Sequence, residues 1–451
     1  MINLDSVMHK PDKSAKIIVI VDYLSEKNRG DAAIHLGLIN ILRNCYPDAT
    51  ISAISTIGAN QFPKMEKEYD QSNLLGIKVI GGLVPTYYPT TKEERKPTLL
   101  LEILNHISLF FRLWLLIALK LRVPVHFLGH MVSKKYRITL ELIKHADLIV
   151  IRGRNYRDRK TAVLEIVRML SKIYNLLICS LLSKKMVLIG ASVWDQRSNL
   201  AGKMLGFAFK SCKFATVRET SSFEAAKKIA YSYDFPEPLL IPDLSFAAFK
   251  DRIAILQNRE ELSQSGHPKI IGLTLHDWKT DGQKTREKYL QSIAKLVQHY
   301  SELNAKILII PQVSVTWEDS SNLLEDLRLN ARTQNISVIS GYPSVQELLQ
   351  LYSSLDLLVA TRMHSAIFAA AVNTPIVAIA YDKGGKWSII EELGYGDYLI
   401  NYDEISPEML IAKMVSCWTN KSNLVFNAHA IVEKNIENIH ILERIIIDYL
   451  E

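Results

Sequence analysis

The chain has 451 residues, of which 48% are hydrophobic and 22% are charged, with four cysteines and a formal net charge of +7. This composition excludes a disordered chain, and the length favours two domains over one. No pair of cysteines has C-x-x-C spacing, so we predict neither a zinc site nor a disulfide framework. Residues 1–15 are polar and lack the apolar stretch of a secretion signal, and we therefore expect a cytoplasmic protein.

The charge is unevenly distributed along the chain. Residues 1–220 hold 33 Lys and Arg against 18 Asp and Glu, whereas the remainder holds 21 against 29. A basic front half predicts an anionic partner, and a membrane surface and a nucleic acid are the two alternatives. The sequence has no zinc finger, no RNP aromatic pattern and no long Lys/Arg block, so we expect no nucleic acid as partner.

Short apolar runs alternate with helical patterns in the front half, which is the rhythm of βαβ units. Strands are predicted at 16–23, 49–55, 77–80, 147–152, 186–191 and 214–218. The first helix is predicted at 31–44, with Asp31 as its N-cap.

The segment 97–124 is strongly apolar, yet Glu102, Asn105, His106 and Arg112 interrupt it. A membrane-spanning helix tolerates such residues poorly at its centre. A buried helix and a helix lying against a membrane surface are the better alternatives. The second alternative predicts a peripheral contact with the inner face of the cell membrane.

The same rhythm returns after the polar stretch 251–269, where we expect the boundary between domains. Strands follow at 270–276, 306–311, 336–340, 356–361 and 375–381, with helices at 284–303, 318–333, 344–353 and 363–373 and a closing helix from about Ser422. The predicted fold is α/β, with two Rossmann-like doubly wound lobes and a cleft between them. The predicted divisions are 1–255, 256–425 and a C-terminal helix, 426–451, that packs back on the first lobe.

Ligands of open α/β sheets bind outside the carboxyl ends of the strands, so the residues that follow each strand are the candidates. Arg362 and His364 follow the strand at 356–361 and open the next helix, where a helix N-terminus favours an anion. The structural alternative is that Arg362 pairs with a neighbouring acid and His364 caps the helix. Lys383 follows the strand at 375–381 and is a second candidate for holding a phosphate.

The front half contains further candidates, at the ends of the strands at 214–218 and 16–23. Arg218 is a candidate anion ligand, with a surface salt bridge as its alternative, and Asp243 is interpreted as part of a turn. Asn28 and Gly30 follow the first strand, and Gly30 permits a tight turn with close approach of a ligand. Asp31 either only caps its helix or also acts as a base toward an acceptor hydroxyl.

Four motifs occur in the order N-R-G-D-A-A-I (28–34), V-R-E-x-x-S (217–222), P-D (242–243) and R-M-H-S-A-I-F-A-A-A-V-N-T-P-I-V-A-I-A-Y-D-K (362–383). In these motifs the chain resembles the polysaccharide pyruvyl transferase family. The resemblance implies two lobes similar to those of GT-B glycosyltransferases. It also implies transfer of pyruvate from phosphoenolpyruvate to a sugar as a cyclic ketal, with no cofactor and no metal. The phosphoenolpyruvate ligands that it implies are Arg218, Arg362, Met363 (through its backbone) and His364.

Two other functions remain open at this point. A GT-B glycosyltransferase with a nucleotide sugar would share the fold, although the sequence lacks G-x-G-x-x-G, G-x-x-x-x-G-K-[ST] and D-x-D motifs. A non-catalytic member of a glycan assembly complex is the other, because the family often has a glycine-rich turn where this chain reads R-G-R-N-Y-R (152–157). The basic front half predicts a lipid-linked glycan as acceptor.

Overall fold

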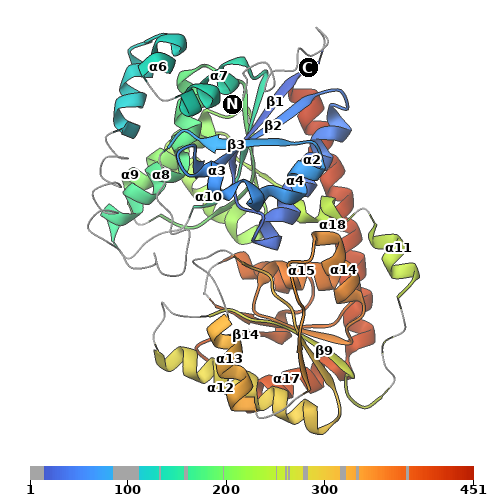
Figure 1. The fold of residues 1–451 in the computed structure, drawn as a ribbon. Coiled ribbons are helices and arrows are strands. Elements are labelled where there is room, and N and C mark those ends of the chain that lie inside the picture. The colour runs from blue at the N-terminus through green and yellow to red at the C-terminus, as the bar shows by residue number, and fades with distance from the viewer. Residues whose placement is uncertain are drawn as a thin grey trace. The chain divides into compact units, whose positions relative to one another are not determined.

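The computed structural model describes residues 15–84, 111–131, 134–156, 161–196, 198–249, 251–259, 262, 265–277, 283–314, 321–331, 335–381 and 385–450. The contacts divide the chain into two compact units (Figure 1). The N-terminal unit comprises the chain up to Glu26, then His35–Leu244 and the chain from Ile439; the C-terminal unit comprises Lys27–Ile34 and Ser245–Asn438.

The N-terminal unit is built on a parallel sheet in the order β3-β2-β1-β4-β6-β7-β8, with β5 paired to β6. Its strands are β1 (Ile17–Tyr23), β2 (Thr50–Gly58), β3 (Lys78–Gly82), β4 (Leu148–Arg152), β5 (Asn155–Tyr156), β6 (Met186–Val193), β7 (Ala215–Val217) and β8 (Leu239–Leu240). Its helices are α2 (Arg29–Cys45) from His35 onward, α3 (Phe62–Met65), η1 (Glu66–Tyr69), α4 (Asp70–Leu74), α6 (Val125–Met131), α7 (Lys134–His145), α8 (Ala162–Leu181), α9 (Asn199–Lys210) and α10 (Thr220–Tyr233).

The C-terminal unit is built on a second parallel sheet in the order β11-β10-β9-β12-β13-β14. Its strands are β9 (Ile270–Thr274), β10 (Lys306–Ile309), β11 (Ile336–Val338), β12 (Leu357–Ala360), β13 (Ile376–Ala380) and β14 (Leu399–Asn401). Its helices are η3 (Leu244–Ala248), α11 (Arg252–Gln257), α12 (Gln283–Glu302), α13 (Ser321–Ala331), α14 (Val345–Ser353), α15 (Met363–Ala371), η4 (Gly385–Trp387), α16 (Ser388–Glu392), η5 (Gly396–Tyr398) and α17 (Pro407–Thr419). The long α18 (Lys421–Leu450) belongs to this unit up to Asn438 and to the N-terminal unit from Ile439.

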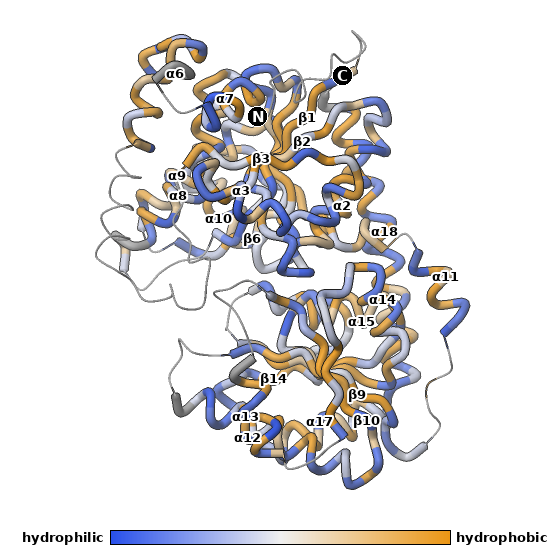
Figure 2. The backbone as a smooth tube through the Cα atoms, in the orientation of Figure 1, coloured by the Kyte–Doolittle hydropathy of each residue, from blue (hydrophilic) through white to orange (hydrophobic). Residues whose placement is uncertain are grey.

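The apolar runs of the sequence form the centres of both sheets. Ile18, Val19, Ile20 and Val21 of β1 are fully buried, because helices cover both faces of a parallel sheet. Figure 2 shows the same pattern in the C-terminal unit, where hydrophobic strands run between helices with hydrophilic outer faces. The α/β class with two Rossmann-like sheets is thereby confirmed.

Each sheet reverses its strand order once, and both reversals follow the 3-2-1-4 pattern of doubly wound folds. In the N-terminal unit the reversal lies between β1 and β4, and in the C-terminal unit it lies between β9 and β12. Crevices outside such switch points are where open α/β sheets bind ligands. The fold therefore gives one such point in each unit.

The polar stretch 251–269, where the domain boundary was expected, contains the helix α11. Arg252 of this helix is 1% exposed, and it donates hydrogen bonds to the Ala371 carbonyl and to Glu433 (2.6 Å). This ion pair, in which Arg252 is buried and Glu433 is half-exposed, fixes α11 within the C-terminal unit. The sequence also gave no expectation for β5, β8, β14 and α17. Three of these are strands of two or three residues, too short to show a period.

Candidate active site

The switch point of the C-terminal unit carries the motif that follows β12. Three hydrogen bonds fix the start of α15 to β9 and α12: Thr361 N donates to the Thr274 carbonyl (3.1 Å), and the hydroxyl pairs Thr274–Ser365 and Tyr289–Thr361 are each 2.9 Å apart. All of these groups are buried. The first turn of α15 is therefore held rigidly at the carboxyl edge of the sheet.

Arg362 is the N-cap residue of α15 and has extended backbone angles (φ −128°, ψ 120°). Its side chain is 8% exposed, and its Nε donates to the Leu275 carbonyl (3.3 Å) just beyond β9. His364 lies inside the helix, one residue after Met363 at the first helical position, and its ring is tilted 54° to that of Phe368. The alternative in which His364 caps the helix is therefore wrong.

The first predicted motif joins the same unit. An antiparallel bridge links Asn28 to Val313, just after β10, and Arg29 N donates to the Gln312 carbonyl (3.0 Å). Arg29 is 6% exposed, and its guanidinium donates to the Tyr342 carbonyl (2.8 Å). Sequence reasoning assigned Arg29 no role, whereas here it anchors residues 27–34 to the carboxyl edge of the C-terminal sheet.

Gly30 packs directly against His364. A Cβ atom built on Gly30 would be 2.2 Å from His364 Nδ1 and 2.5 Å from its Cγ, closer than real side chains approach. Asn28 Oδ1 accepts a hydrogen bond from Gly30 N (3.1 Å), and α2 begins at Arg29. The prediction of Asp31 as N-cap is wrong, because Asp31 lies in the first turn. Asn28, Gly30 and Asp31 thus share one edge with Arg362 and His364.

The residues after β13 add an aromatic and a basic group. Lys383 lies outside the described residues. Lys386 is 9% exposed, donates to the Tyr381 hydroxyl, and has its ammonium 4.0 Å from the centre of the Tyr381 ring. On Tyr381 stacks His276, with ring centres 4.4 Å apart. Sequence reasoning selected neither His276 nor Lys386, and the role of Lys383 stays a prediction. The signal for His276 was its position at the end of the predicted strand 270–276.

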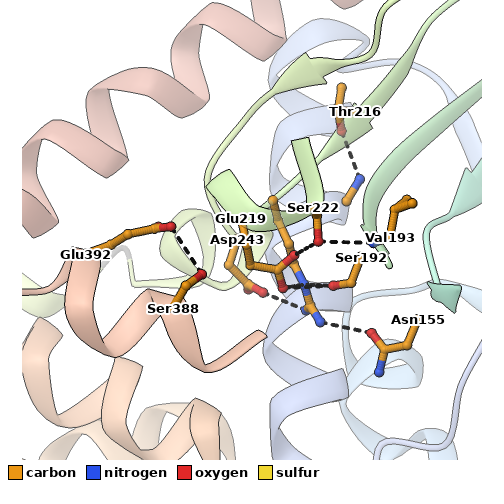
Figure 3. Close-up of polar contacts among 11 residues, drawn as sticks. Asn155, Ser192, Val193, Thr216, Glu219, Ser222, Asp243, Ser388 and Glu392 are labelled. Carbon is orange, nitrogen blue, oxygen red and sulfur yellow. Dashed lines mark hydrogen bonds and ion pairs between the residues drawn. The ribbon is translucent and has the colours of Figure 1, made fainter. Parts of the chain in front are cut away.

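Arg218 lies in the N-terminal unit, within a buried polar cluster. Figure 3 labels its partners Asn155, Ser192, Glu219 and Asp243. Its Nε donates to Glu219 Oε1 (2.7 Å) and Ser192 Oγ (2.8 Å), and the remaining nitrogens donate to Asp243 Oδ2 (2.8 Å) and Asn155 Oδ1 (3.2 Å). Its side chain is 8% exposed and Asp243 is fully buried. A surface salt bridge was therefore the wrong alternative, and Asp243 is an ion-pair partner rather than merely part of a turn.

Two opposing effects act on the pKa of Arg218. Burial disfavours the charged guanidinium, but Glu219 and Asp243 more than offset this and raise the pKa above its ordinary value. Glu219 Oε2 in turn accepts from Ser222 Oγ (2.7 Å), whose oxygen also accepts from Val193 N (3.0 Å). The cluster thereby ties the end of β7 to β6 and to the chain that follows β8. The role of Arg218 as a phosphoenolpyruvate ligand stays a prediction.

No group of three or more His, Cys, Asp and Glu side chains in the described ranges could hold a metal ion. None of the helices that the structure describes is long and apolar enough to cross a membrane.

Comparison with known proteins adds a family and a fold. The model of the polysaccharide pyruvyl transferase family matches residues 28–383. Among solved structures, UDP-GlcNAc 2-epimerase from Neisseria meningitidis bound to UDP-GlcNAc has a TM-score of 0.53 at 11% identity, covering 96% of this chain and 99% of that one. Arabidopsis thaliana UGT89C1 in complex with quercetin also has a TM-score of 0.53, at 12% identity, covering 96% and 100%. No curated protein matches. At these identities the structures show a shared GT-B-like fold.

Proposed function

The chain belongs to the polysaccharide pyruvyl transferase family, and we propose that it transfers pyruvate from phosphoenolpyruvate to two hydroxyls of a glycan sugar, forming a cyclic ketal and releasing phosphate. One observation carries this proposal: Arg362 and His364 lie together with Asn28, Gly30 and Asp31 at the carboxyl edge of the C-terminal sheet. These are the two most separated motifs of the family resemblance, and the fold brings them to one switch point.

The donor is an anion with a carboxylate and a phosphate, and this edge offers the groups to hold it. Arg362 supplies a planar guanidinium suited to either group, and the Met363 backbone supplies an N–H at the N-terminus of α15. Two further cations are predicted for the donor: Lys383, because it follows the strand that ends at Ala380, and Arg218, which the family resemblance assigns. Such cations also stabilise the negative charge that builds up on the departing phosphate.

The reaction needs one proton donor and one base. His364 protonates the methylene carbon of phosphoenolpyruvate, and the carbon that carries phosphate then bonds to the first sugar oxygen, whose proton Asp31 accepts. The second sugar hydroxyl attacks the same carbon, and phosphate leaves with the electrons of its C–O bond. Of the two hydroxyl protons, one balances the proton gained by the new methyl group and the other leaves with phosphate.

The acceptor we propose is a lipid-linked glycan at the inner face of the cell membrane. The helical residues 111–120 pack Leu115 and Leu119 into the core, while Ile117 and the neighbouring Leu121 are 58% and 72% exposed. These two exposed residues form an apolar strip, and the exposed Lys120 and Arg122 lie on either side of Leu121 in the chain. An apolar strip among basic groups suits an anionic membrane surface. Residues 97–110 of the predicted membrane segment lie outside the described residues.

The test is release of phosphate from phosphoenolpyruvate in the presence of a panel of free and lipid-linked sugars. We expect His364→Ala to lower the rate about 10²- to 10⁴-fold, the usual contribution of a general acid. His299→Ala is the matched control, because it removes an imidazole from α12 on the outside of the same unit. Full phosphate release by the His364→Ala variant would show that this histidine is not the proton donor.

A titration separates the proposal from the glycosyltransferase alternative. Phosphoenolpyruvate should raise the Tm of the protein in proportion to the logarithm of its concentration, whereas UDP-sugars should not. The reverse result would favour a nucleotide-sugar enzyme. No phosphate release with any acceptor, together with no thermal shift by phosphoenolpyruvate, would favour the non-catalytic alternative.

A further inference from the structure

The N-terminal unit contains a polar cavity that the proposed donor chemistry does not use. It has a volume of about 60 Å³ and lies at the carboxyl ends of β1 to β4. Since one water needs roughly 10–15 Å³ by this measure, the cavity has room for about five waters or for one edge of a sugar ring. Its lining includes Asp22, Thr56, Arg112, Arg154, Ser171 and Asn175.

The cavity lies at the switch point of the N-terminal sheet. Asp22 is the last residue but one of β1. Arg154 comes two residues after the end of β4, the strand at which the order reverses. Arg362 and His364 occupy the equivalent point of the C-terminal sheet. The topology alone therefore marks this cavity as a ligand site.

Asp22 is an unusual residue at this position. It is 1% exposed and has a left-handed backbone (φ 62°), which few side chains adopt. Its Oδ1 accepts a hydrogen bond from Asn175 Nδ2 (2.7 Å), but in the described part of the chain its buried Oδ2 has no hydrogen-bond partner. Buried carboxylate oxygens are normally paired, so an unpaired one in a cavity lining points to a missing donor.

Two cations complete the lining. The half-buried guanidinium of Arg154 makes no hydrogen bond or ion pair with any described side chain, although its charge acts on Asp22. Arg112 donates to Ser171 Oγ (3.2 Å) and lies 5.9 Å from the centre of the Tyr174 ring. One carboxylate and two guanidinium groups leave the lining with one positive charge, which a ligand with a single negative charge neutralises.

We infer that this cavity binds one acidic sugar, whose ring hydroxyl donates to Asp22 Oδ2 and whose carboxylate or phosphate accepts from Arg154. A neutral sugar would satisfy Asp22 but leave Arg154 without a counter-charge. A small inorganic anion would satisfy Arg154 but be repelled by Asp22. Only a ligand with both groups answers both observations. We assign this sugar to the acceptor glycan, and this part of the inference rests on the proposed pyruvyl transfer.

The experiment is a direct binding titration with the full chain and without phosphoenolpyruvate. Four probes separate the chemistry: glucuronate, glucose 1-phosphate, glucose and inorganic phosphate. We expect at least one acidic sugar to bind at least tenfold more tightly than both glucose and inorganic phosphate. Preference for glucuronate assigns the charge to a uronic acid of the glycan, and preference for glucose 1-phosphate assigns it to the phosphate that links a glycan to its carrier.

Variants test the two named contacts. Asp22→Asn and Arg154→Gln should each weaken acidic-sugar binding at least tenfold. The matched controls are Asp147→Asn, at the amino ends of the same strands, and Arg168→Gln, on the exposed face of α8, and both should bind normally. Tighter binding by Asp22→Asn, equal binding of acidic and neutral sugars, or no binding of any probe would each overturn the inference.

The outcomes keep this inference separate from the proposed function. Binding of an acidic sugar by a protein that releases no phosphate from phosphoenolpyruvate would overturn the function and leave the cavity assignment standing. Pyruvyl transfer that is unchanged in Asp22→Asn and Arg154→Gln would overturn the cavity assignment and leave the function standing.

Discussion

Gly30 and His364 are in direct contact, although 333 residues separate them in the chain: a Cβ atom on Gly30 would be 2.2 Å from His364 Nδ1. The contact joins the first turn of α2 to the first turn of α15 within the C-terminal unit. Glycine is required here for close approach rather than for backbone freedom, since it lies in a helical turn. The observed position of His364, the proposed proton donor, therefore requires that residue 30 has no side chain.

The first prediction concerns Gly30→Ala. The added methyl group has to displace the His364 ring, so phosphate release from phosphoenolpyruvate should fall at least tenfold while the protein stays folded. Gly266→Ala is the control, because nothing lies within 4 Å of a Cβ at that position. Both effects are read from initial rates and thermal unfolding of the same preparations. Wild-type rates in Gly30→Ala would mean that the position of His364 does not matter for the reaction.

The second prediction concerns the buried ion pair of Arg218 and Asp243. Asp243→Asn leaves a buried guanidinium short of one counter-charge, which should lower the free energy of unfolding by about 3–5 kcal/mol. Asp234→Asn makes the same chemical change in a solvent-exposed pair with Lys210 and should have no measurable effect. Urea titrations of the three proteins give the comparison. An equal effect of the two substitutions would contradict the structural role given to the Arg218 cluster.

The third prediction concerns Asp22, a second buried aspartate, whose replacement by Asn should stabilise the protein rather than destabilise it. Burial raises the pKa of Asp22 above its ordinary value of 3.8, while Arg154 and Asn175 oppose the shift. The folded protein therefore holds the Asp22 proton more tightly than the unfolded chain. The resulting stabilisation is complete below about pH 3.8 and is lost as the pH rises through the folded-state pKa. Asp22→Asn cannot ionise, so the variant should not lose this stabilisation as the pH rises. Asparagine also tolerates the left-handed backbone at this position.

The measurement is Tm against pH for wild type and Asp22→Asn. We expect the variant to be more stable at pH 7 and the difference to shrink as the pH falls toward 4. A variant less stable than wild type at pH 7 would show that the charged carboxylate of Asp22 stabilises the folded protein, which would contradict this prediction. A gain in stability with a loss of acidic-sugar binding is the signature of a residue kept for its ligand.

The fourth prediction concerns the apolar strip formed by Ile117 and Leu121. Ile117→Glu and Leu121→Glu should each abolish binding to vesicles that contain anionic lipids, because charge on this face opposes insertion among acyl chains. Binding of the wild type should weaken with salt and with neutral lipid, since the exposed Lys120 and Arg122 flank Leu121. Val415→Glu, on an exposed apolar position of α17, is the control. The measurement is co-flotation of the protein with vesicles. If both glutamate variants still float with anionic vesicles, the proposed membrane contact is wrong.

The sequence alone determined the two parallel sheets and the identity of the central candidates. Buried strands such as β1 and β12 are continuous apolar runs, and the helices between them have regular periods, so their type is encoded locally. Arg362 and His364 could be selected because they directly follow a strand, which is where α/β sheets bind ligands. The order of the motifs then indicated the family.

The tertiary structure decided which side chains meet. Gly30 with His364, Arg218 with Asp243 and Asp22 with Arg154 are pairs drawn from separate strands or helices, and no local period links their members. The sequence marked Arg218 and Arg362 as equivalent residues at strand ends. Packing gave Arg218 two buried carboxylates, and it gave Arg362 a neighbouring carbonyl at the start of a helix. Such partners depend on strand order and register, because only these bring distant strand ends to the same edge.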